Sequence, residues 1–193
     1  DEVTLDALRA RWPDPPPPIA ALIFYRALVQ AGHTAAIAAL IEALTERGLA
    51  PLPLYVTSLK EPPAAAMIAR VFAEAPPAVI LNTTAFAVAT PGQGDGASAF
   101  APVDAPVIQA IFASSDVETW RQGTHGLSAR DIAMNVALPE VDGRIISRAV
   151  AFKTLARQDA DCQVDVIDSV PEPDRVAFVA DLAAAWVRLR HTQ

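Results

Sequence analysis

Two carboxylates and a guanidinium stand close together in the segment 138–144, Leu-Pro-Glu-Val-Asp-Gly-Arg. Proline stops a strand and glycine permits a tight turn, so we expect this segment to follow a strand over residues 132–138. In an extended segment Glu140 and Asp142 would face the same way. Two such carboxylates can hold a divalent cation or accept protons from a weakly acidic nitrogen ligand. A surface turn in which Arg144 neutralises both acids is the alternative, and the residues leave it open.

Other polar residues follow further predicted strands. Ligands of open parallel sheets bind beyond the carboxyl ends of the strands, so we expect a polar crevice there. Ser, Thr and Asn at such places also cap helices and form turns, and an arginine can either grip a ligand carboxylate or pair with a nearby acid. The candidate binding residues are Arg26, Thr57, Asn82, Ser114, Ser115 and Arg144.

The elements that position these residues alternate between strands and helices. Continuous apolar runs over residues 19–25, 52–56 and 78–81 are typical of strands buried on both faces, as in parallel sheets. Amphipathic patterns predict helices between them, over residues 34–47 and from Pro62 onward. The alternation predicts an α/β fold, a Rossmann-like or flavodoxin-like, doubly wound and mostly parallel sheet.

The rest of the chain continues this pattern less regularly. We expect a strand over residues 106–111, a short helix over 116–121, a strand over 164–167 and a long helix from about Pro173. The glycine-rich stretch 91–96 lacks the Lys-Ser/Thr of a phosphate-binding loop and the spacing of a dinucleotide turn, so it predicts a connecting loop. We expect residues 1–18 to form a lead-in helix and a proline linker, and residues 19–193 to form the α/β domain.

Composition excludes several classes of function. The net charge is −7, and no cluster of Lys and Arg is present, which argues against binding to nucleic acid or an anionic membrane. The single cysteine, Cys162, cannot form an internal disulfide, so we expect a reducing compartment, the cytoplasm. Hydrolase motifs such as a nucleophile elbow or HExxH are absent, and a lone His33 before a helix is more typical of a capping or surface residue.

The segment 137–144, followed by 147–153, closely resembles the large subunit of aerobic, ATP-dependent cobaltochelatase. That family is related to the large subunit of magnesium chelatase, which carries a similar Leu-Pro-Glu-hydrophobic-Asp-Gly run. Four further segments match in the same order: 24–32, 52–60, 81–87 and 173–178. The resemblance extends from about residue 13 to residue 191 of this chain. It corresponds to only a minor internal part of the family's very long subunit.

The resemblance implies a chemistry and a set of partners. Enzymes of this family are ligases that form nitrogen–metal bonds. They insert Co(II), as a substrate, into the tetrapyrrole hydrogenobyrinic acid a,c-diamide during aerobic cobalamin biosynthesis. ATP and Mg are used by two smaller partner subunits, one an AAA+ ATPase, and not by this chain. The glutamate that matches Glu140 would lie at the active cleft and is the one candidate metal contact. Asp142 and Arg144 would orient it or grip the substrate.

Three classes of function stay open at this point. In the first class, the chain is part of a chelatase, forms one wall of its cleft and is inactive alone. A part of a magnesium chelatase-like large subunit belongs to the same class. Alternatively, it is a binding module for a small acid, or a scaffold segment that positions other domains. A doubly wound sheet serves all three equally well.

Overall fold

The computed structural model describes residues 4–87, 100, 103–124, 126–159 and 164–191. The glycine-rich loop predicted over residues 91–96 lies outside these ranges. Six strands form one sheet in the order β2-β1-β3-β4-β5-β6. The first five are parallel, and β6 runs antiparallel to β5. The strands are β1 (Ile19–Tyr25), β2 (Ala50–Val56), β3 (Val79–Asn82), β4 (Val107–Asp116), β5 (Ile145–Asp159) and β6 (Val164–Pro171).

This strand order confirms the predicted fold class. The order 2-1-3-4-5 is that of flavodoxin-like doubly wound sheets, in which the chain first adds strands on one side of β1 and then on the other. The predicted strand over residues 19–25 is β1, residue for residue. Successive side chains of a strand point to opposite faces of the sheet. Because both faces of β1 are buried, every position along it is apolar.

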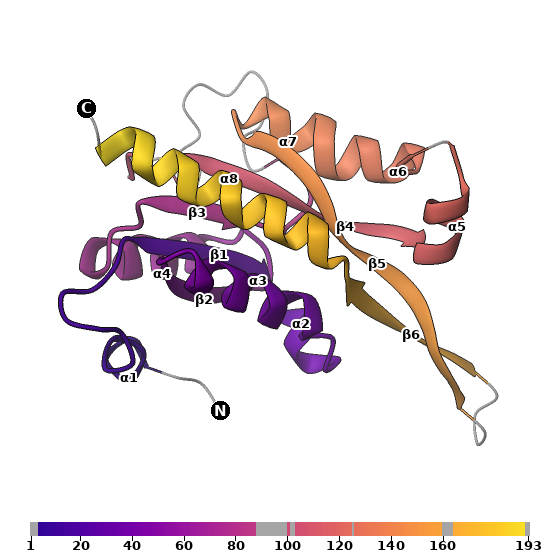
Figure 1. Cartoon of the computed structure of the whole chain (residues 1–193), viewed down its shortest axis with the longest axis horizontal. Helices are drawn as coiled ribbons and strands as arrows, with labels where there is room; N and C mark the ends of the chain where they lie inside the picture. The colour runs from indigo at the N-terminus through magenta and orange to yellow at the C-terminus, as the bar shows by residue number, and fades with distance from the viewer. Residues whose placement is uncertain (1–3, 88–99, 101–102, 125, 160–163, 192–193) are drawn as a thin grey trace.

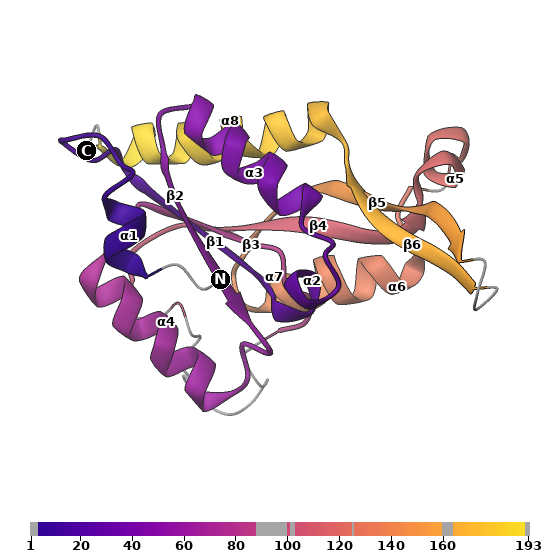
Figure 2. The same ribbon diagram turned by 90° about the horizontal axis from the view of Figure 1, so that it is seen from below.

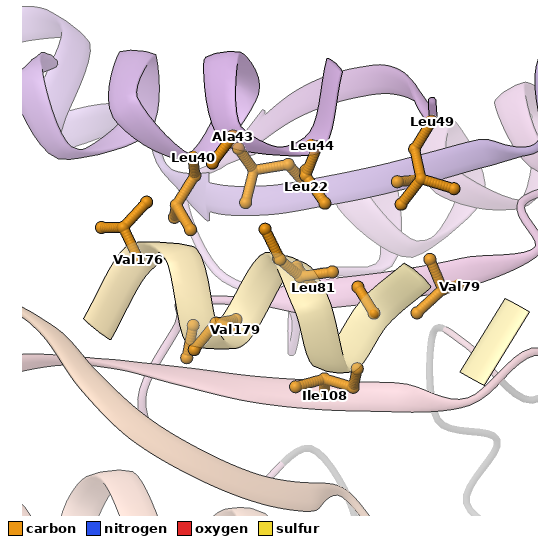
Figure 3. Packing of buried hydrophobic residues seen from close by; sticks show 14 of the residues in the cluster. Leu22, Leu40, Ala43, Leu44, Leu49, Val79, Leu81, Ile108, Val176 and Val179 are labelled. Carbon is orange, nitrogen blue, oxygen red and sulfur yellow. The ribbon is translucent and has the colours of Figure 1, made fainter. Parts of the chain in front are cut away.

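Helices cover both faces of the sheet. On one face, α3 (Ala35–Glu46) and α8 (Pro173–His191) pack Leu40 and Val179 against Leu22 and Leu81 of the strands (Figure 3). On the other, α4 (Pro62–Glu74) packs Ile68 and Phe72 against the opposite side of the strands. Figure 2 shows this two-sided layering. The short helix α1 (Leu5–Arg9) packs against the cluster under α4, and α2 (Arg26–Gln30) follows β1 directly.

The strand predicted over residues 132–138 is wrong. Residues 129–141 are helical throughout: α6 (Ala129–Ile132), a π-helical turn η1 (Ala133–Ala137) and α7 (Leu138–Val141). The Ser128 hydroxyl caps the start by accepting from the Asp131 amide at 3.0 Å. Pro139 does not end the helix because it falls in the first turn of α7, directly after η1, where a missing N–H is tolerated.

The fifth strand follows this helix instead of preceding it. β5 begins at Ile145, after the turn at Gly143, whose φ of +72° only glycine adopts freely. Beyond β4, β5 continues with β6 as a two-stranded arm that projects from the sheet (Figure 1). The predicted strand over 164–167 is confirmed as part of β6. The predicted helix over 116–121 is α5 (Val117–Gln122), capped by the Asp116 carboxylate.

Candidate functional site

A network of buried amide groups occupies the centre of the sheet. Asn82 at the end of β3 is the register partner of Gln109 in β4, and its Nδ2 donates to Gln109 Oε1 at 2.8 Å. Gln109 Nε2 donates in turn to the Thr84 carbonyl at 2.9 Å, and the Thr84 hydroxyl donates to Asn82 Oδ1 at 3.0 Å. These side chains are fully buried, so the network joins the loop after β3 rigidly to β4.

Arg144 connects this network to the segment that carries the two acids. Its Nη1 donates to Gln109 Oε1 at 2.9 Å, and its Nη2 lies 2.7 Å from Asp142 Oδ2. The side chains of Asp142 and Arg144 are each 1% exposed. Burial lowers the pKa of Arg144, and the neighbouring Asp142 carboxylate opposes that effect. The predicted residues Asn82, Asp142 and Arg144 are therefore brought together, but inside the protein, where they hold the site's framework and present no surface to a ligand.

Glu140 is separated from this buried network. It lies on α7 with an exposed side chain, whereas Asp142 is the residue that ends α7 and turns inward. The prediction that the two carboxylates face the same way is wrong, because residues two apart in a helix point to different sides. Leu138 and Val141, three residues apart on α7, are also exposed. Glu140 thus offers an exposed carboxylate on α7.

The segment 83–87 lies between the end of β1 and the helical stretch 129–141. At one end the Thr83 amide and hydroxyl donate to the Ile23 carbonyl, at 2.9 and 3.0 Å. At the other, the Phe86 amide donates to the Met134 carbonyl at 2.9 Å. Between them Tyr25 Oη donates to the Ala85 carbonyl and accepts from the Ala85 amide. Burial raises the pKa of the Tyr25 phenol.

Phe86 has an uncommon conformation in this segment. Its φ is +70°, a left-handed value that a non-glycine residue adopts only when its surroundings impose it, and the residue is 47% exposed. The ring borders a small pocket at the carboxyl ends of β1, β2 and β3. The pocket is lined by Tyr25, Ser58, Leu59, Lys60, Ala85, Phe86 and Ala87.

Sequence reasoning missed Tyr25, Lys60 and Phe86 as site residues. The rule that a crevice lies beyond the strand ends selected small polar residues and passed over the aromatic and lysine side chains that line the pocket. All three lie in segments that resemble the cobaltochelatase family, 24–32, 52–60 and 81–87, and that was the available signal.

The remaining predicted residues lie at two separate places. Arg26 and Thr57 follow Tyr25 and Val56, which are register partners, so both stand exposed at the same edge as the pocket. Ser114 lies five residues beyond Gln109 on β4, roughly 16 Å further along the sheet. Its amide and hydroxyl donate to the buried Asp131 carboxylate, the hydroxyl at 2.9 Å, which ties α6 to β4. Ser114 and the neighbouring Ser115 are not part of the pocket edge.

Across the residues that the structure describes, no three His, Cys, Asp or Glu side chains gather closely enough to bind a metal ion. Glu140 is therefore a single carboxylate and not a member of a metal-binding cluster. The same described ranges contain no helix that is both long enough and apolar enough to cross a membrane.

Nearly the whole chain matches a known protein family. The model of the family described as CobN/Magnesium Chelatase matches residues 3–193. This chain belongs to that family. The aerobic cobaltochelatase subunit CobN of a Sinorhizobium species is 44% identical over 92% of the chain, and that of Pseudomonas aeruginosa 40% identical over 97%. The predicted resemblance is thereby confirmed.

A solved structure agrees with both sequence comparisons. The catalytic subunit of cobaltochelatase from Mycobacterium tuberculosis superposes with a TM-score of 0.74 at 33% identity and covers 91% of this chain. In each case the match takes up a small part of the relative: the chain spans 14% and 15% of the two CobN sequences and 15% of the solved chain. The chain is thus homologous to one α/β segment of a cobaltochelatase large subunit.

Proposed function

We propose that this chain forms one wall of the cleft in which an aerobic cobaltochelatase inserts Co(II) into hydrogenobyrinic acid a,c-diamide. One observation carries the proposal. The exposed carboxylate of Glu140 sits on a short helix whose end is anchored to the centre of the sheet by the buried pair Asp142–Arg144. An exposed acid on a rigid mount suits a residue that must meet a substrate in a fixed geometry.

Metal insertion needs a proton acceptor. Co(II) replaces protons on the pyrrole nitrogens of the macrocycle, and a carboxylate beside the ring can collect those protons or accompany the metal. Glu140 is accessible for this role. Asp142 is not, because its carboxylate is buried against Arg144. We therefore assign proton transfer or metal escort to Glu140, and positioning of α7 to Asp142 and Arg144.

The proposal extends to the setting of the reaction. Cobalt is chosen over magnesium because the relatives at 40–44% identity are named as cobaltochelatase subunits. ATP with Mg would be used by two smaller partner subunits, one of them an AAA+ ATPase, in the cytoplasm. This chain would contribute no ATP site and would be inactive by itself.

The test uses the intact large subunit, with its partner subunits and ATP. Glu140→Gln removes the basic oxygen and keeps the shape of the side chain. We expect the rate of cobalt insertion to fall about 100-fold or more, as for loss of a general base, while tetrapyrrole affinity changes less than about threefold. Glu42→Gln, an exposed position on α3, is the matched control. A Glu140→Gln enzyme with the wild-type insertion rate would refute the assignment.

A scaffold function for the β5–β6 arm is the second candidate. Leu155 and Ile167 are register partners on the two strands of the arm, and both are exposed. Two apolar side chains facing each other across an exposed ribbon favour contact with another domain of the large subunit. Replacing both by Thr in the intact subunit should make the arm more sensitive to limited proteolysis. Unchanged proteolysis would remove the support for this role.

A further inference from the structure

We propose that the pocket beside Phe86 is a binding site for one peripheral carboxylate of the tetrapyrrole, with Lys60 pairing to the carboxylate and Phe86 packing against the face of the macrocycle. This inference rests on the proposed function and adds a specific contact to it. It concerns residues distinct from Glu140, so the two can fail separately.

The position and size of the pocket define what can occupy it. It lies beyond the end of β1, between the segments that follow β2 and β3, and so adjoins the β1/β3 boundary at which the strand order reverses and doubly wound sheets bind ligands. Its volume is about 110 Å³. A whole macrocycle needs a pocket several times larger, of about 300 Å³ or more. The pocket therefore suits one short side chain of the macrocycle, such as an acetate or propionate group.

The wall of the pocket is held in place before any ligand arrives. Tyr25 Oη makes two hydrogen bonds to the backbone of Ala85, at 3.1 and 3.2 Å. The amide of Phe86 is fixed to Met134 in the helical stretch that leads to Glu140. Because these groups are already ordered, little conformational entropy is lost on binding.

Phe86 is placed where a flat ligand would cover it. The left-handed backbone costs free energy, and an exposed ring gains little from burial in return. Such strain is retained where the surroundings and the function require it. A flat conjugated ring stacks well on a phenyl ring. From Met134, whose carbonyl holds Phe86, the helical chain runs on for six residues to Glu140, roughly 9 Å of helix axis.

Lys60 determines the charge of the group that is bound. It contributes a positive charge to the lining, and none of the other described lining residues is acidic. No ion pair joins Lys60 to a carboxylate in the described part of the chain. An ammonium group without an acidic neighbour in the lining attracts an anionic group such as a carboxylate. Hydrogenobyrinic acid a,c-diamide retains free carboxylates around its ring, so it offers that anion.

The experiment measures tetrapyrrole affinity by visible absorption, using the intact large subunit. Two ligands are compared: hydrogenobyrinic acid a,c-diamide, and an analogue in which the remaining carboxyl groups are amidated. We expect Lys60→Met to weaken binding of the acid about tenfold and to leave the analogue unaffected, since one charge-assisted hydrogen bond is lost. Lys60→Arg should retain affinity. Phe86→Gly should weaken both ligands about fivefold.

The controls keep folding apart from binding. Glycine adopts the backbone of Phe86 without strain, so Phe86→Gly preserves the segment. Arg70→Met on α4 and Phe178→Ala on α8 are matched exposed substitutions away from the pocket, and should bind both ligands as the wild type does.

Three results would overturn the inference. If Lys60→Met weakens both ligands equally, the pocket does not recognise a carboxylate. If Lys60→Met and Phe86→Gly bind like the wild type while Glu140→Gln loses cobalt insertion, this site is wrong and the proposed function stands. If the wild-type intact subunit binds neither ligand, both proposals fail together.

Discussion

Asp142 and Arg144 form an ion pair in the interior of the protein, with Asp142 Oδ2 2.7 Å from Arg144 Nη2. Removing one partner leaves an uncompensated charge in a place that water does not reach. We expect Asp142→Ala or Arg144→Met to lower the free energy of unfolding of the 193-residue chain by about 3–5 kcal/mol, measured by urea denaturation. The double variant should lose clearly less than the sum of the two. Strictly additive losses would show that the pair is not coupled.

Gln109 accepts hydrogen bonds from both Asn82 and Arg144. Leucine at this position would have a similar size but would remove that acceptor, which leaves Asn82 Nδ2 and Arg144 Nη1 with only the Thr84 carbonyl, at 3.0 and 3.4 Å. We expect Gln109→Leu to reduce the free energy of unfolding by roughly 1–3 kcal/mol, because two buried donors lose their shorter hydrogen bond and must share one carbonyl. Gln30→Leu, at an exposed position on α2, is the control and should change it by less than about 0.5 kcal/mol. Equal effects of the two variants would contradict the role of the network.

The left-handed backbone of Phe86 leads to opposite expectations for two substitutions. Glycine accepts φ of +70° without steric cost, whereas a β-branched side chain is strained there. Phe86→Gly should shift the free energy of unfolding by less than about 1 kcal/mol, and Phe86→Val should lower it by about 1–3 kcal/mol. Thermal unfolding of both variants at one pH decides the matter. A valine variant as stable as the glycine variant would show that the strain is absent in solution.

His33 and Asp168 link the loop before α3 to β6, with His33 Nδ1 2.7 Å from Asp168 Oδ1. The hydrogen bond from His33 lowers the pKa of Asp168 below its usual 3.8, with a further contribution from the Ser169 amide. A depressed carboxyl pKa stabilises the fold above the unfolded value of 3.8, and that stabilisation is lost as the pH falls through the folded value.

The corresponding test compares the wild type with Asp168→Asn across pH. Because the pair is partly exposed, we expect a difference of at most about 1 kcal/mol in the free energy of unfolding at neutral pH. The two stability curves should converge below pH 3.8. Curves that stay parallel down to pH 2 would show that the ion pair contributes nothing.

Local sequence was sufficient for the strands and helices that are buried in a regular way. β1, β2 and β3 are short apolar runs covered on both faces, and α3 and α4 have clear apolar stripes, so hydrophobic periodicity located them. It failed for residues 132–138. A short apolar run fits a strand or a helix equally well, and here the helix buries Asn135 while Ile132 and Leu138 stay exposed. The long strand β5 was missed because much of it lies in the arm, away from a buried core.

The sequence by itself determined the fold class and the family. The fold class follows from apolar runs and amphipathic patterns, and the family follows from short matching segments. Both signals lie in residues that are neighbours in the chain. Only the tertiary structure decided the direction of each candidate side chain. It turned Asp142 and Arg144 inward, left Glu140 exposed and brought Tyr25, Lys60 and Phe86 around one pocket. The physical reason is that burial, charge pairing and backbone strain depend on contacts between residues that are far apart in the chain, and no local pattern records those contacts.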